Sequence, residues 1–465
     1  MPPPQSERGR MERGSISRPF QNHSRAASTS LFVKRLKIMQ NTHQNGRLFK
    51  VYFSRHLHSL RIAALVLIGL AIGPAAMAQS WPLATAPAAL AQKSTITTLA
   101  NFNGSNGSTP MADLTLSGST LYGTTEFGGA YGKGEVFSVP TKGGKITVLA
   151  SFNGKNGNQP QAGLILSGST LYGTTILGGA YNDGTVYSVP TEGGKITVLA
   201  SFNGANGGSP KGGLILSGST LYGTTLGGLG NDGAVFSLPK NGGMPTVLAR
   251  FKGNNGSHPG GRLTLIGSTL YGTTLYGGAY RCGTVFSVPI TGGTPTVLAS
   301  FNGDNGQNPR ENRTLIGTIL YGTTLNGGTN GCGTVFSVPT TGGAPTILVN
   351  FNGTNGHAPN SSLALSGSIL YGTTFNGGAN HKGTVFSVPT MGGTPTILAS
   401  FNGKNGSLPI AGLILSGNTL YGTTSYGTTA GPGGNALGTI FSISIPASTP
   451  TPTQPPSVSP PSPQK

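Results

Sequence analysis

The chain has 465 residues, of which 78 are Gly and 33 are Pro, and only 8% of its residues are charged. So little charge argues against a disordered acidic or basic chain, while a hydrophobic content of 35% can support a core of short, regular strands. The formal net charge is +19, but twelve of the 29 basic residues and two of the ten acidic ones precede residue 62, and the later bases are scattered rather than clustered as in a nucleic-acid binder.

The N-terminal part of the chain has the order of a secretory leader. A basic region precedes an apolar run at 62–72, and an Ala-Met-Ala motif ends at Ala78, directly before Gln79. Eleven apolar residues are well short of the roughly 20 that span a bilayer. We therefore predict a basic extension and signal peptide over residues 1–78, cleavage between Ala78 and Gln79, and an exported protein (periplasmic, cell-surface or secreted) with no transmembrane segment in the mature chain. The alternative is an uncleaved anchor that extends through Ala78.

After a short linker, predicted at 79–93, one tetrad recurs along the chain. Tyr-Gly-Thr-Thr begins at Tyr122, Tyr172, Tyr222, Tyr271, Tyr321, Tyr371 and Tyr421. Seven copies at a nearly constant spacing of about 50 residues indicate a repeat architecture.

Each repeat contains four short runs rich in β-branched and aromatic residues. In the second copy they lie at 164–169, 170–175, 184–190 and 196–202, separated by Gly, Pro and Asn. Short turns join the first run to the second and the third to the fourth, so the runs are predicted as consecutive antiparallel strands. Seven four-stranded units predict a β-propeller. A β-helix is the alternative, but its parallel coils need no hairpin turns.

The two ends of the array predict how the ring closes. An extra run at 96–102 matches the fourth strand of the other units, and the last unit stops after its third run, at 438–445. The N-terminal strand would complete the last blade and remove the exposed ends of an open array. We predict an all-β, seven-bladed β-propeller of four-stranded antiparallel blades over 94–445, followed by a disordered Pro-, Ser- and Thr-rich tail at 446–465.

Two sets of repeated aromatic residues are predicted to pack. One equivalent position on the third strand should fill the core between blades, and it is occupied by Phe137, Tyr187, Phe236, Phe286, Phe336, Phe386 and Phe441. Because every blade carries the tetrad Tyr, that residue too is predicted to pack rather than to bind a ligand.

The long connections, from strand two to three and from strand four to the next blade, should share one rim. Function is often carried by loops on a rigid scaffold, so this rim is the candidate binding site. Its Asn-Gly pairs are expected to form turns. The residues that differ between copies could stack on and hydrogen-bond a sugar: Tyr131, Tyr181, Asp183, Asp232, Tyr280, Arg281, Arg310, Arg313 and His381. Ordinary variability of exposed loops is the alternative.

Few residues suggest catalysis or metal binding. Asp183 and Asp232 occupy corresponding loop positions and are the only suggestive carboxylate pair, although chance coincidence is the better explanation of their positions. The His residues after the leader have no Cys or carboxylate at metal-ligand spacing, so no metal or cofactor is expected. Cys282 and Cys332 occupy the same place in adjacent blades, where they form either a disulfide or two free thiols.

The repeated Leu-Tyr-Gly-Thr-Thr, Gly-Thr-Val-Phe-Ser and Gly-Gly-x-x-Thr-x-Leu-x-x-Phe series resembles the GloVer repeat of the choice-of-anchor tandem repeat proteins over 94–445. The resemblance implies an exported or surface bacterial protein of unassigned activity, often with a C-terminal sorting signal. The tail departs from that pattern because it ends without an apolar segment.

Together these features predict a monomeric, non-catalytic binding or scaffold module for a glycan or a surface protein. Two alternatives stay open: an extracellular carbohydrate-active hydrolase or lyase that uses the long-loop rim, and a purely structural surface repeat protein.

Overall fold

The computed structural model describes residues 94–228, 230–427 and 437–445, without the side chains of 311–313. The predicted leader, its cleavage between Ala78 and Gln79, the linker and the tail lie outside these residues. Within them every regular element is a strand. No helix in this part of the chain could cross a membrane.

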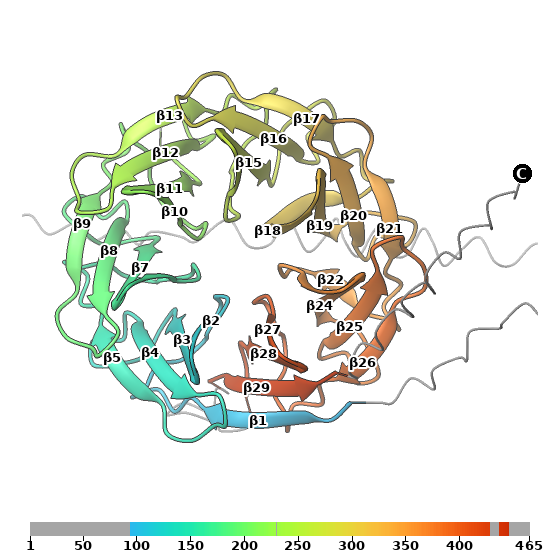
Figure 1. Ribbon diagram of the computed structural model, residues 1–465, viewed down its shortest axis with the longest axis horizontal. Helices are drawn as coiled ribbons and strands as arrows, with labels where there is room; N and C mark the ends of the chain where they lie inside the picture. The colour runs from blue at the N-terminus through green and yellow to red at the C-terminus, as the bar shows by residue number, and fades with distance from the viewer. Residues whose placement is uncertain (1–93, 229, 428–436, 446–465) are drawn as a thin grey trace, which may run out of the picture. The chain divides into compact units, whose positions relative to one another are not determined.

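The strands form seven antiparallel sheets arranged as blades around a ring (Figure 1). The innermost strands of blades 1 to 7 are β2 (Thr115–Ser117), β6 (Ile165–Ser167), β10 (Ile215–Ser217), β14 (Thr264–Ile266), β18 (Gln307–Ile316), β22 (His357–Pro359) with β23 (Ala364–Ser366), and β27 (Ile414–Ser416). The second strands are β3 (Thr120–Thr125), β7 (Thr170–Thr175), β11 (Thr220–Thr225), β15 (Thr269–Thr274), β19 (Ile319–Asn326), β24 (Ile369–Asn376) and β28 (Thr419–Thr424).

The third strands are β4 (Glu135–Pro140), β8 (Thr185–Pro190), β12 (Ala234–Pro239), β16 (Thr284–Pro289), β20 (Thr334–Pro339), β25 (Thr384–Pro389) and β29 (Thr439–Ser444). The outer strands are β5 (Thr147–Ser151), β9 (Thr197–Ser201), β13 (Thr246–Arg250), β17 (Thr296–Ser300), β21 (Thr346–Asn350), β26 (Thr396–Ser400) and β1 (Ile96–Asn101). The seven-bladed β-propeller is therefore confirmed.

The N-terminal strand closes the ring as predicted. β1 pairs antiparallel with β29, with Ile96 opposite Ile443 and Asn101 opposite Thr439 (Figure 1). The pairing continues beyond the strand, because the Phe102 N–H donates to the Gly438 carbonyl at 3.1 Å. Blade 7 thus contains strands from both ends of the repeat array, so the propeller has no unpaired terminal blade.

The innermost strand is irregular in two blades, where the repeat pattern predicts the same short strand as elsewhere. In blade 5, β18 runs for ten residues along β19, with a register shift between Arg310 and Thr314. In blade 6 the corresponding segment is divided into β22 and β23, which both pair with β24. The structure consequently has 29 strands where the sequence predicts 28.

Aromatic pairs fill the spaces between blades. Phe202 follows the outer strand of blade 2 and packs edge-on against Phe236 of blade 3, with ring centroids 5.1 Å apart. Equivalent pairs recur at every interface with centroids 4.8–5.1 Å apart. Edge-to-face packing at this distance is favourable for aromatic rings. The predicted core role of the third-strand aromatic residues is confirmed.

The tetrad also has a packing role. Tyr222 is buried in a cluster with Leu263 and Phe286 of the next blade. Gly223 lies against the Phe236 ring, and a Cβ on Gly223 would stand 2.7 Å from Phe236 Cζ. Tyr-Gly-Thr-Thr is therefore a packing motif, as the sequence predicts.

The second Thr of the tetrad pairs with a Thr at the start of the third strand. Thr175 Oγ1 and Thr185 Oγ1 lie 2.9 Å apart, and four other blades have the same pair at 2.8–2.9 Å. Blade 3 has Ala234 at this position, so the buried Thr225 hydroxyl has no hydrogen-bond partner. Blade 1 has Glu135 there, and the Thr125 hydroxyl is likewise unpaired.

Candidate functional site

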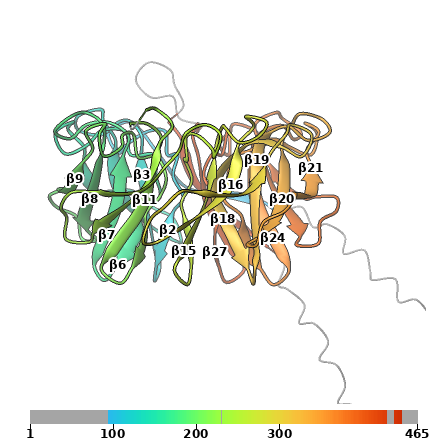
Figure 2. The ribbon, with the colours of Figure 1, turned by 90° about the horizontal axis from the view of Figure 1, so that it is seen from above.

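The long connections lie on one face of the propeller and the short hairpin turns on the other (Figure 2). We call the first the long-loop face. In blade 2 it comprises residues 152–164, which enter the blade, and 176–184, which join β7 to β8. The predicted division between rims follows directly from the antiparallel strand order.

The Asn-Gly pairs build compact turns in the entering loops. Asn153 and Asn156 bind each other reciprocally, each side-chain Oδ1 accepting from the other's backbone N–H at 2.8 and 3.1 Å. The positive φ angles fall on the following glycines, Gly154 at 91° and Gly157 at 126°. The pairs are turn-formers as expected, with Gly adopting the left-handed backbone and Asn supplying the side-chain bonds.

The residue before the loop Pro has positive φ in every blade although it is never Gly. These residues are Thr109, Gln159, Ser209, His258, Asn308, Ala358 and Leu408, with φ between 53° and 59°. Each donates its N–H to the preceding blade, as Gln159 does to the Lys133 carbonyl at 3.1 Å. Sequence alone favours an extended residue before Pro, so this strained connection was not predicted. It ties the loops of neighbouring blades together.

All exposed large aromatic side chains in the described part of the chain lie on the long-loop face, in the connections between second and third strands. They are Phe127, Tyr131, Tyr181, Tyr276, Tyr280 and Tyr426. The three predicted tyrosines are the most exposed of them, at 61% for Tyr131, 63% for Tyr181 and 62% for Tyr280. The structure therefore places them on one face, in blades 1, 2 and 4.

The other predicted loop residues have different environments. Arg281 and His381 are exposed and have positive φ, at 59° and 54°. Asp183 and Asp232 are half-buried, and their backbone carbonyls accept N–H groups from Ser209 and His258 of the next blade at 2.8 Å. Both aspartates therefore help to join blades through their main chains.

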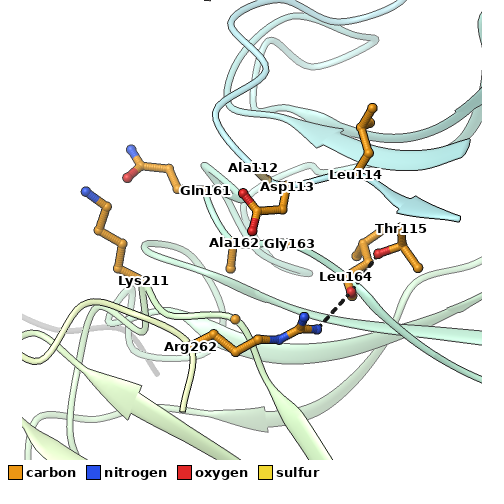
Figure 3. Close-up of a pocket in the computed structure, with 11 residues that line it drawn as sticks. Ala112, Asp113, Leu114, Thr115, Gln161, Ala162, Gly163, Leu164, Lys211 and Arg262 are labelled. Atoms are coloured by element: carbon orange, nitrogen blue, oxygen red, sulfur yellow. Dashed lines mark hydrogen bonds between the residues drawn. The ribbon is translucent and has the colours of Figure 1, made fainter. Parts of the chain in front are cut away.

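A small polar pocket lies where the innermost segments meet, with a free volume of about 20 Å³. We call it the axial pocket. It is lined by residues 112–115, 161–164, Lys211, Gly213 and Arg262, which come from blades 1 to 4 (Figure 3). Asp113, Gln161, Lys211 and Arg262 supply its charged and amide side chains.

Asp113 and Arg262 each connect their own blade to the adjacent blade and to the one beyond it. The Asp113 carboxylate accepts from Ser362 Oγ of blade 6 at 2.9 Å and from the Gly412 N–H of blade 7 at 2.5 Å. Arg262 donates from Nε to the Leu214 carbonyl at 2.9 Å. Its Nη2 donates to the Leu164 carbonyl at 3.2 Å (Figure 3). Burial lowers the pKa of Arg262, and the charge of Asp113 acts in the opposite direction.

Glycines make room for these two side chains. Asp113 and Arg262 occupy equivalent positions, at which the other described blades have Gly163, Gly213, Ser362 and Gly412. A Cβ on Gly412 would lie 2.9 Å from Asp113 Oδ1, and one on Gly213 would lie 3.4 Å from Arg262 Nε.

Glu126 is a buried carboxyl group next to the axial pocket. Its Oε1 accepts from Gln161 Nε2 at 2.6 Å. Burial raises the pKa of Glu126, against the opposing effects of the Gln161 hydrogen bond and the Lys211 charge. The equivalent position in five other blades is apolar.

A second, smaller hollow, with a free volume of about 10 Å³, shares Lys211 with the axial pocket. It is lined by Lys211, Gly260, Leu275 and Arg310. Arg310 Nε is buried there without a hydrogen-bond partner. The predicted loop residue Arg310 is thus close to the axis. The side chain of Arg313 lies outside the described residues.

The sequence prediction missed the centre of this face. The residues concerned lie between the loop Pro and the innermost strand: Asp113, Gln161, Lys211 and Arg262. In this segment the sequence pattern predicts a strand but no site residues. The available signal was the difference between copies: aligned repeats have Met111, Gln161, Lys211, Gly260, Arg310, Asn360 and Ile410 directly after the Pro.

Cys282 and Cys332 are free thiols in the structure. They pack in different inter-blade clusters, and Cys332 Sγ donates to the Asn330 carbonyl at 3.4 Å. No group of three His, Cys, Asp or Glu side chains that could hold a metal ion occurs within residues 94–228, 230–427 and 437–445.

Comparison with known proteins identifies the repeat. The family described as the Gloeobacter/Verrucomicrobia repeat matches residues 89–286 and 227–441. No curated protein matches the chain.

Solved structures with similar folds share little sequence with the chain. A europium-containing methanol dehydrogenase is 11% identical, with a TM-score of 0.47 over 75% of this chain and 93% of its own. The PQQ-bound form of the Streptomyces coelicolor aldose sugar dehydrogenase is 14% identical, with a TM-score of 0.40 over 60% and 92%. TolB from Acinetobacter baumannii is 14% identical, with a TM-score of 0.37 over 56% and 58%. These similarities carry no argument about activity.

Proposed function

This chain belongs to the Gloeobacter/Verrucomicrobia repeat family, and from that premise we propose that it is an exported, non-catalytic module that binds a glycan on its long-loop face. The exposed aromatic residues carry the proposal, because all six lie on that face. An aromatic ring can pack against the C–H-rich side of a sugar, while its polar neighbours bind the hydroxyl groups. Backbone hydrogen bonds tie each loop to the next and order the loop backbones without a ligand, which lowers the entropy cost of binding.

The test is a glycan array screened with the wild type and with a triple variant, Tyr131→Ala, Tyr181→Ala and Tyr280→Ala. We expect the triple variant to lose at least about tenfold in affinity for every bound glycan, since aromatic anchors commonly contribute more than 1 kcal/mol each. The control removes Met244 and Met391, which are exposed in the short turns of the opposite face at 82% and 90%. Equal binding by the wild type and the tyrosine variant would remove the proposal.

A hydrolase that uses the same face is the second candidate, and Glu126 favours it. A buried carboxyl with a raised pKa suits a general acid. If the wild type cleaves a glycan that it binds, product should disappear in Glu126→Gln and persist in Asp183→Asn. Absence of cleaved product from every bound glycan would exclude this candidate.

A further inference from the structure

A groove lies along the outer strand of blade 3, and we call it the β13 groove. It is lined by residues 247–250 of β13, by Lys252, Asn254 and Asn255 of the following loop, and by Gly293 and Thr294 of blade 4. Its free volume of about 530 Å³ falls within the range of ligand-binding pockets. We propose that the β13 groove binds an extended acidic segment of a partner protein.

Two basic side chains distinguish this groove from the same region of the other blades. Arg250 ends β13, whereas the other six outer strands end in Ser or Asn. Lys252 stands where the other six loops have Asn. Both side chains are exposed, and neither forms a hydrogen bond or an ion pair with another described residue. The described lining contains no acidic residue, so the charge of the groove complements a ligand with carboxylates.

Lys252 replaces a residue that forms a hydrogen bond in the other loops. In those six loops the first Asn side chain accepts the N–H of the Asn three residues later, as Asn302 Oδ1 does from Asn305 at 2.9 Å. The Lys252 loop keeps only the reverse bond, from the Lys252 N–H to Asn255 Oδ1 at 2.8 Å. Lys has no side-chain oxygen, so the Asn255 N–H loses that acceptor. A local departure of this kind is typical of a functional position.

The position of the groove favours a peptide over a glycan. β13 is the edge strand of its sheet and lies on the outside of the ring (Figure 1). Extended peptides commonly bind beside edge strands. The Gly293 N–H already donates to the Leu248 carbonyl at 2.9 Å, so the side chains of the peptide would supply much of the contact. Val247 and Leu248 offer aliphatic surface to apolar side chains, and Arg250 and Lys252 offer charge to carboxylates.

The lining also separates this inference from the proposed glycan site. None of the described residues that line the groove is aromatic, so a sugar ring would find no stacking surface there. The exposed aromatic residues that carry the proposed function lie in other loops. The two proposals therefore stand or fall independently.

The experiment uses immobilised peptides of about ten residues, long enough to follow β13 and its loop. They are presented in pairs, one member rich in Glu and Val and the other with Gln at every Glu position. The members of a pair differ in charge alone, so their affinity ratio isolates recognition of the carboxylates. We expect the wild type to prefer the Glu member by about tenfold, with a preference that falls as salt rises.

Variants that restore the common residues provide a matched test. Arg250→Ser and Lys252→Asn introduce side chains that other blades already carry, so the double variant should be as stable as the wild type in urea unfolding. It should lose the preference for Glu peptides, with about threefold lost from each residue. The control, Lys155→Asn with Lys404→Asn, removes two exposed charges from the corresponding loops of blades 2 and 7. It should leave the ratio unchanged.

Three results would overturn the inference. The first is equal binding of the Glu and Gln peptides, or no binding of either, by the wild type. The second is an unchanged ratio in the double variant. Dextran sulfate serves as an anionic glycan, and the third result is a double variant that loses dextran sulfate binding while peptide binding is unaltered, since the groove would then bind a glycan. The glycan array with the tyrosine variant tests the proposed function separately.

Discussion

Between the blades, one aromatic pair recurs around the ring with centroids 4.8–5.1 Å apart, whereas the equivalent positions at the axis include Asp113, Arg262, Ser362 and three glycines. The interfaces between blades are equivalent, so the same aromatic pair can fill all of them. At the axis, all the innermost segments converge on one space, and a large side chain from one blade requires a small one from another. Repetition therefore identifies packing positions, and differences between copies identify the region where this chain has its own chemistry.

The most severe test of the repeated core is Phe202→Ala. Removing one ring of the Phe202–Phe236 pair should lower the free energy of unfolding by about 3–5 kcal/mol, because it deletes a fully buried side chain and leaves a cavity. Urea unfolding followed by circular dichroism measures the change. Tyr131→Ala, at an exposed aromatic residue, should change stability by less than about 0.5 kcal/mol. Similar losses in the two variants would contradict the core assignment.

Asp113→Ala tests whether the side-chain contacts near the axis also stabilise the ring. The substitution leaves the Gly412 N–H and Ser362 Oγ without their acceptor and removes the negative charge near Arg262, so we expect a loss of about 1.5–3 kcal/mol. Asp304→Ala, in an exposed loop, is the matched control and should have little effect. An Asp113 variant as stable as the wild type would mean that its contacts with blades 6 and 7 contribute no net stability.

Tyr187 is an exception within the repeated core, since six blades have Phe at its position. Its hydroxyl is buried without a partner, and burial raises the pKa of Tyr187 far above its ordinary value. Tyr187→Phe should therefore stabilise the protein by about 1–2 kcal/mol. Phe236→Tyr, the reverse change in the next blade, should destabilise it. A destabilised Tyr187→Phe variant would show that the hydroxyl has a favourable interaction.

Much of the fold could be predicted because it depends on local pattern and on the count of strands. The unpaired run at 96–102 and the missing fourth strand after 445 predict closure, which the pairing of Ile96 with Ile443 confirms. The aromatic residues of the loops, such as Tyr131, could be placed on one face because strand order alone determines the rim.

The axial residues could not be predicted in the same way. Ser362 and Asp113 are 249 positions apart, and their contact depends on how the segments from non-adjacent blades share the axis. The alternation of residues along the strands of one blade does not indicate which residues of non-adjacent blades come into contact. The positive φ of Gln159 and its equivalents was also missed, since it results from hydrogen bonds to the preceding blade rather than from the Pro that follows.

The smallest expected effect concerns a position where one blade departs from the common Thr pair. Ala234→Thr in blade 3 should give the buried Thr225 hydroxyl the partner that it lacks and stabilise the protein by about 1 kcal/mol. Thr284→Ala in blade 4 removes the equivalent pair and should destabilise by a similar amount, which urea unfolding of both variants can measure. If Ala234→Thr destabilises the protein instead, the shorter connection of blade 3 must leave no room for the methyl and hydroxyl groups that five other blades accommodate. The local loop, rather than the common pair, would then determine which residue this position accepts.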